Sequence, residues 1–127
     1  MSTPFVRAAG GRRSETPNGV MTTAASPTLG GTQGLSLWWV EMRSGAAGPE
    51  HVFDSEQVWH LVEGQARIRV GEDVSELMPG DTAVLPAGVV RRITALTALR
   101  AVVCGSGTAT VSVPGEGASR GTPPWVA

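Results

Sequence analysis

Glycine and proline residues divide most of this chain into short apolar segments, and their spacing is the strongest constraint on the fold. Between residues 35 and 113 such segments recur at intervals of roughly ten residues, which is typical of an all-β sandwich or barrel. Apolar and polar residues alternate through residues 65–70, as in a strand with one buried face. No segment keeps a helical apolar face beyond one or two turns. The sequence therefore predicts an all-β fold.

The two ends of the chain differ from this central region in composition and periodicity. Residues 1–34 are rich in Gly, Pro, Ser and Thr and keep no regular period, so we expect a flexible N-terminal arm in which residues 20–24 form an edge strand. Residues 114–127 are Gly/Pro-rich and end in Pro123-Pro124-Trp125. We expect this tail to pack onto the barrel, residues 35–113, through Trp125, as a structural anchor or as a lid over a binding site.

Composition excludes several classes of function. The formal charge is −1, so no basic surface indicates binding to nucleic acid, and no apolar run approaches the roughly 20 residues that span a bilayer. Lys and Tyr are absent, which removes Schiff-base chemistry and a phenolic acid. A single Cys, Cys104, excludes an internal disulfide and is expected to be a buried, inert thiol. We expect a cytoplasmic protein, because no signal peptide is recognisable at the N-terminus.

Two stretches of the sequence resemble the two motifs of the cupin family. Residues 48–64, which end in Glu63-Gly64, are similar to the first motif, and residues 78–91, with Pro79-Gly80-Asp81 and Pro86-Ala87-Gly88, are similar to the second. The resemblance is to small, single-domain cupins of the type-2 kind. It implies one antiparallel jelly-roll β-barrel, a homodimer, and a small-molecule ligand inside the barrel.

The resemblance fails at the residues that usually bind the metal of this family. The four ligand positions are held here by His51, Phe53, Gln57 and Arg91, where the family pattern has three His and one Glu. Phe cannot coordinate a metal, and Arg is permanently cationic. A positive charge near a divalent ion in a low-dielectric cavity opposes binding. We therefore expect no cofactor; if a metal bound, His51 and Gln57 would be its ligands.

Strand alternation nominates the residues of a ligand site. His51, Phe53, Gln57 and Trp59 share one face if parity is kept through residues 54–56, and the resemblance places Arg91 on a strand beside them. His51 is the candidate base, with a structural His as the alternative. Gln57 is the candidate orienting group, with a barrel-lining amide as the alternative. Phe53 and Trp59 would wall the ligand, although Trp59 also suits core packing.

Two alternative roles are expected for Arg91. It is either a clamp for an anionic ligand or a structural partner of a carboxylate such as Glu41, Glu50 or Glu56. Of the adjacent pair Trp38 and Trp39, only one can face inward.

The function expected from these residues is metal-independent proton transfer. The chain would act on, or bind, a small anionic or enolisable molecule as an isomerase, cyclase or lyase, with His51 as base, Arg91 as anion stabiliser and Gln57 as orienting group. A binding or sensor protein without turnover is the first alternative. A divergent metal-dependent cupin enzyme, such as a dioxygenase, is the second.

Overall fold

A computed structural model describes residues 4–127 of the chain. Apart from one short 3-10 turn, η1 (Ala8–Gly10), the elements of the described residues are β-strands. The strands are β1 (Arg12–Thr16), β2 (Gly19–Ala25), β3 (Leu35–Met42), β4 (Val52–Phe53), β5 (Gln57–Glu63), β6 (Ala66–Val70), β7 (Asp73–Leu77), β8 (Thr82–Leu85), β9 (Arg91–Ala95), β10 (Leu99–Ser106) and β11 (Val111–Ser112). The predicted all-β class is confirmed.

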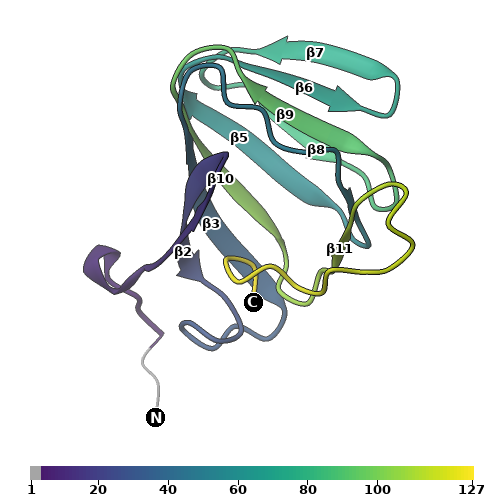
Figure 1. Cartoon of the computed structure of the whole chain (residues 1–127). Helices are drawn as coiled ribbons and strands as arrows, with labels where there is room; N and C mark the ends of the chain where they lie inside the picture. Colours follow the sequence, from purple (N-terminus) through teal and green to yellow (C-terminus); the bar gives the residue numbers. More distant parts are fainter. Residues whose placement is uncertain (1–3) are drawn as a thin grey trace.

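The strands form an antiparallel jelly-roll barrel. A six-stranded sheet has the order β1-β2-β3-β10-β5-β8, a three-stranded sheet has the order β7-β6-β9, and β11 pairs with β4. Every pairing between named strands is antiparallel. Figure 1 shows β6, β7 and β9 on one side of the molecule and β2, β3 and β10 on the other, with the interior between them.

Alternation along the strands sets which side chains enter that interior. In β3, Trp38, Val40 and Met42 are buried, whereas Leu37 is exposed and Trp39 only half-buried. This resolves the adjacent Trp pair: Trp38 faces the interior and Trp39 the outer face, because side chains one residue apart point to opposite faces of a sheet.

Tight backbone geometry fixes the turn after β5. Gly64 has a φ of 83°, and a Cβ at this position would lie 2.1 Å from the carbonyl oxygen of Ala98. Any other residue would clash with the main chain there as well as being strained, so Gly is required. The Glu63-Gly64 pair of the first motif thus holds β5 against the start of β10.

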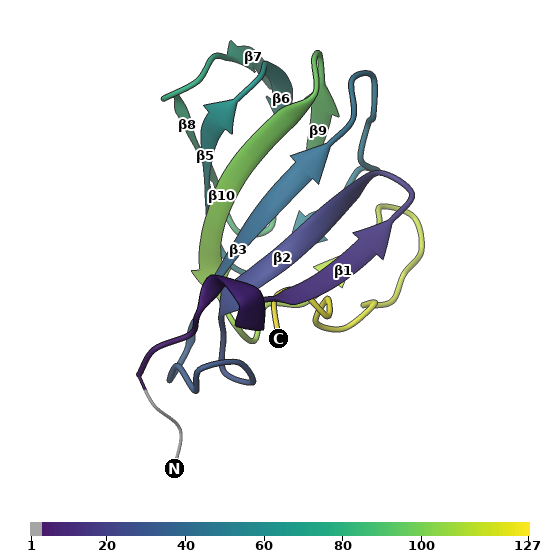
Figure 2. The ribbon, with the colours of Figure 1, turned by 90° about the vertical axis from the view of Figure 1, so that its left-hand side faces the viewer.

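The N-terminal segment adds two strands to the large sheet. β2 pairs with β3, and β1 pairs with the outer side of β2 (Figure 2). β2 covers the residues 20–24 that the sequence predicted as an edge strand, but it lies inside the sheet, and β1 forms the edge. The turn between β1 and β2, at Pro17 and Asn18, reaches the cavity described below.

The C-terminal tail packs closely against this N-terminal hairpin. The Thr23 hydroxyl donates to the carbonyl oxygen of Trp125 at 2.7 Å, and the Ser26 hydroxyl donates to the carbonyl oxygen of Ala127 at 2.7 Å. Val126 is fully buried in the core. The tail therefore contributes to the hydrophobic core as well as to the wall of the interior.

The outer face of the six-stranded sheet carries several apolar side chains. Leu37 on β3 and Val84 on β8 are exposed, and so is Cys104 on β10, which pairs with Leu37. The prediction of a buried thiol is wrong: Val103 occupies the inward position of β10 and Cys104 the outward one. The expected homodimer stays a prediction. Within residues 4–127, no helix is long and apolar enough to cross a membrane.

Candidate functional site

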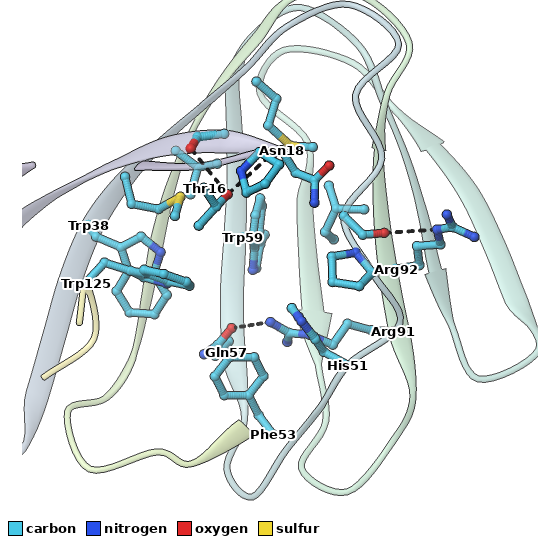
Figure 3. A pocket seen from close by; sticks show the side chains of 18 of the residues that line it. Thr16, Asn18, Trp38, His51, Phe53, Gln57, Trp59, Arg91, Arg92 and Trp125 are labelled. Atoms are coloured by element: carbon cyan, nitrogen blue, oxygen red, sulfur yellow. Dashed lines mark hydrogen bonds between the residues drawn. The ribbon is translucent and has the colours of Figure 1, made fainter. Parts of the chain in front are cut away.

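One end of the barrel interior is hollow. The cavity has a volume of about 340 Å³ and is lined by side chains from β2, β3, β4, β5 and β9, by the β1–β2 turn and by the tail. The five residues nominated from the sequence, His51, Phe53, Gln57, Trp59 and Arg91, all line it (Figure 3). Their roles in binding or catalysis stay predictions.

Arg91, the first residue of β9, lies beside Gln57 at one end of the cavity, which we call its floor. It is 7% exposed, and its guanidinium donates to the Oε1 atom of Gln57 at 2.9 Å. The guanidinium carbon lies 4.2 Å from the ring centroid of Phe53. Burial lowers the pKa of Arg91 to about 10, so the group remains charged at neutral pH.

The charge of Arg91 has no counter-ion in the part of the chain that the structure describes. Within residues 4–127, no carboxylate forms an ion pair with it. Of the partners considered from the sequence, Glu50 pairs with Arg69 and Glu41 lies 3.9 Å from Arg100. Arg91 therefore forms no ion pair with a carboxylate of the described residues. Its guanidinium contacts the neutral amide of Gln57 and the ring face of Phe53.

Gln57 and Trp59 leave hydrogen-bond donors unused in the same region. Gln57 is 1% exposed; its Oε1 accepts from Arg91, but its buried Nε2 has no partner among the described residues. The buried indole Nε1 of Trp59 is also without a partner there. Buried donors are nearly always hydrogen-bonded, and an orphaned one costs about 1–3 kcal/mol. The cavity floor is thus rich in donors and lacks an acceptor to satisfy them.

His51 stands beside this floor and is held there by its backbone. Its N–H donates to the carbonyl of Arg91 at 3.0 Å, and the N–H of Arg91 donates back at 2.9 Å. Its ring meets Phe53 edge-on, with 6.2 Å between centroids. Desolvation, then the positive charges of Arg91 and Arg120, lower the pKa of His51 to about 4. The imidazole is therefore neutral at pH 7 and can accept a proton.

The remaining walls are largely apolar and aromatic. Trp38 and Trp125 lie on one side of the cavity, His51 and Arg91 on the other, and Trp59 and Gln57 between them (Figure 3). Trp38 is 2% exposed, so its ring is packed in place and does not need to be ordered by a ligand. Such walls would desolvate a flat apolar group.

Sequence reasoning missed several residues that line the cavity. Met21 of β2, Asn18 of the β1–β2 turn and Arg120 of the tail all contribute. Alternation does not mark Met21, because the adjacent Val20 is apolar too, and we expected a flexible N-terminal arm in this segment. Nothing local marks Asn18 or Arg120, because each reaches the cavity only through packing between distant parts of the chain.

The residues present do not fit a divalent metal. No group of three or more His, Cys, Asp and Glu side chains lies close enough to hold one among residues 4–127. At the family's ligand positions, the Oε1 of Gln57 is already occupied by the Arg91 guanidinium, which itself replaces a ligand with a positive charge. A metal bound to His51 and Gln57 would face that charge without a carboxylate to offset it.

Comparison with known proteins agrees with this architecture. The cupin domain model matches residues 38–105. An RmlC-like cupin from Shewanella frigidimarina NCIMB 400 superposes with a TM-score of 0.72 at 19% identity, covering 83% of this chain and 91% of that one. KdgF from Halomonas sp. gives 0.71 at 20% identity, with 83% and 94% covered.

A larger enzyme shares the fold over part of its length. Oxalate decarboxylase from Bacillus subtilis superposes with a TM-score of 0.74 at 15% identity, covering 84% of this chain but 29% of the longer one. No curated protein matches the sequence. Similarity at these identities concerns the fold alone. Since the family model spans more than half of the chain, and the barrel has the expected strand order, this protein belongs to the cupin family.

Proposed function

We propose that this cupin binds a small anionic molecule in the barrel cavity without a metal and that His51 exchanges a proton with it. The observation that carries the proposal is the buried Arg91, whose charge has no carboxylate partner among residues 4–127. No Asp or Glu of the described residues lines the cavity. An unpaired buried charge is costly, and a bound anion would offset that cost.

The geometry supports a separate chemical role for each of Arg91, Gln57 and His51. Arg91 would bind an anionic oxygen, and Gln57 would orient the guanidinium through its Oε1. The neutral His51 would take a proton from the carbon next to a carbonyl group. The electron pair of that C–H bond would form an enolate, whose oxygen Arg91 stabilises, and His51 would return the proton to the same carbon or, in a β,γ-unsaturated substrate, to the γ carbon. The first outcome is proton exchange and the second is a balanced double-bond isomerisation; neither needs an oxidant.

Anion binding would also make His51 a better base. Its low pKa comes partly from the positive charge of Arg91. A bound anion offsets that charge and moves the pKa of His51 back toward 6.5, closer to the working pH of a general base. Binding and base strength would therefore increase together.

Deuterium exchange tests this proposal. Pyruvate and phenylpyruvate, incubated with the protein in D₂O, should lose the proton NMR signals of the hydrogens next to the carbonyl faster than in buffer. His51→Gln should abolish the acceleration and leave binding mostly intact, whereas Arg91→Met should weaken binding. If no anion binds in a manner that depends on Arg91, the proposal is wrong.

A binding protein without turnover is the second candidate, and one observation favours it. The pKa of His51 near 4 makes the free imidazole a weak base, and no carboxyl group of the described residues lines the cavity as a second acid or base. Binding of both 2-oxo acids that depends on Arg91, with no accelerated exchange, would select this candidate.

A further inference from the structure

The charges around the cavity leave one buried cation for a ligand. Three Arg side chains line it, but Arg120 is paired with Glu116 at 2.6 Å. Arg92 is exposed and donates to the carbonyl oxygen of Gly48 at 3.0 Å. Only Arg91 is both buried and without an anionic partner among residues 4–127. The buried part of the cavity therefore offers a single cation to an anionic ligand.

The free hydrogen-bonding groups at the floor define the head of that ligand. The Nε2 of Gln57 and the Nε1 of Trp59 are buried donors without partners, and both residues line the cavity with Arg91. Phe53 covers one face of the Arg91 guanidinium, so the N–H groups at its edge remain for a ligand. A carboxylate accepts hydrogen bonds only and is planar like the guanidinium, which allows two parallel bonds.

The walls above the floor define the body of the ligand. Trp38, Trp59 and Trp125 surround the space (Figure 3). Met21 and other apolar side chains also line it. The volume of about 340 Å³ is near the lower limit of small-molecule sites, which extend over roughly 300–1,000 Å³. Rigid indole rings favour flat apolar groups, which stack on them at low entropic cost.

We propose that the occupant is a monocarboxylate with a flat, apolar, aromatic-sized body. Its carboxylate lies on Arg91, Gln57 and Trp59, and its body extends toward Trp38 and Trp125. This inference rests on the proposed function, because it assumes the same cavity and the same anion-binding Arg91. It goes beyond it by fixing the charge, the head group and the shape of the ligand.

Calorimetric titration with four probes tests the assignment. 2-Naphthoate has the predicted head and body, 2-naphthamide is its neutral isostere, acetate has the head alone, and inorganic phosphate has a larger charge. We expect 2-naphthoate to bind about 10- to 100-fold more tightly than 2-naphthamide, since a hydrogen bond to a charged group contributes about that much. Acetate and phosphate should bind more weakly still.

Substitutions locate the two halves of the ligand. Arg91→Met should weaken 2-naphthoate binding about 10- to 100-fold and leave 2-naphthamide almost unchanged. Trp125→Ala should weaken both naphthalene probes to a similar degree, because it removes wall area and no charge. Arg67→Met is the matched control: Arg67 lies on β6, outside the cavity, and pairs with Glu76, so binding should not change. Circular dichroism of each variant verifies folding, and Arg91→Lys, which keeps the charge, should retain part of the affinity if the charge is what binds.

The outcomes separate this inference from the proposed function. Equal affinity for 2-naphthoate and 2-naphthamide would overturn the assigned carboxylate. Binding of acetate or phosphate as tight as that of 2-naphthoate, still lost in Arg91→Met, would overturn the apolar monocarboxylate and leave the anion site standing. If no probe binds in a manner that depends on Arg91, both proposals are wrong.

Discussion

The two ends of the barrel interior share strands β5 and β9 but differ in what those strands place there. At one end Leu61, Ala66, Ile68, Leu77 and Leu99 are buried together, and only about 10 Å³ of free space remains. At the other end the space is about 340 Å³. Alternation continues unchanged along β5 and β9 from one end to the other, so on these two strands the choice of side chains separates the packed core from the cavity.

Two strands show this change directly. The inward positions of β5 are Gln57, Trp59 and Leu61, and those of β9 begin with Arg91 and Ile93. Each strand starts with a polar group at the hollow end and continues with apolar groups toward the packed end. Trp59 borders both spaces. The packed end should therefore supply stability and the hollow end specificity, and substitutions can test whether the two are separable.

The largest effect is expected at the packed end. Leu61 is 3% exposed, and Leu61→Ala should lower the free energy of unfolding by about 2–5 kcal/mol, because the substitution leaves a cavity in a closely packed region. Urea denaturation followed by circular dichroism measures this loss. The folded variant should bind 2-naphthoate with unchanged affinity. A marked loss of binding by the folded variant would show that the two ends are coupled.

Part of this division was predictable from the sequence. Strand alternation predicted that Gln57 and Trp59 share one face, the resemblance placed Gln57 at a position inside the barrel, and both residues are buried. The second motif likewise predicted Arg91 on the strand beside them, and the backbones of His51 and Arg91 are hydrogen-bonded. Local periodicity is enough here because a strand fixes the direction of each side chain relative to its neighbours.

The mouth of the cavity was predictable only in part, because the sequence predicted that the tail packs through Trp125 but not which strand it meets. Its walls include the β1–β2 turn and Trp125, and the tail is held to β2 by the bond from Thr23 to Trp125 across 102 positions of sequence. No local pattern encodes such a contact. Cys104 differs from these residues: alternation with the buried Val103 already indicated an exposed thiol, and the apolar composition of β10 outweighed that signal.

An intermediate effect is expected from pH, and it arises at the hollow end. In the unfolded chain His51 has an ordinary pKa of 6.5, and in the folded protein burial, Arg91 and Arg120 lower it to about 4. Between these values the unfolded state binds more protons. Stability is therefore unaffected by His51 above pH 6.5 and falls as the pH decreases toward 4. Since His51 is only half-buried, the loss should be about 1–2 kcal/mol.

Thermal or urea denaturation at several pH values measures this loss, and His51→Gln is its control. The variant lacks the titrating group, so the difference between its stability and that of the parent should change between pH 6.5 and 4 and be constant above 6.5. The carboxylates titrate in both proteins and cancel. A difference that is flat across this range would contradict the low pKa of His51.

The smallest effect on stability is expected at Arg91, although its effect on binding is large. Arg91→Met removes the bond to Gln57, which costs about 1 kcal/mol, but it also removes a buried charge that no carboxylate of the described residues offsets. The two changes oppose each other, so the free energy of unfolding should move by no more than about 1 kcal/mol in either direction. Urea denaturation of the ligand-free protein measures it. A loss as large as that of Leu61→Ala would mean that Arg91 holds the barrel together, and the hollow end would then be part of the structural core and not a site set apart for a ligand.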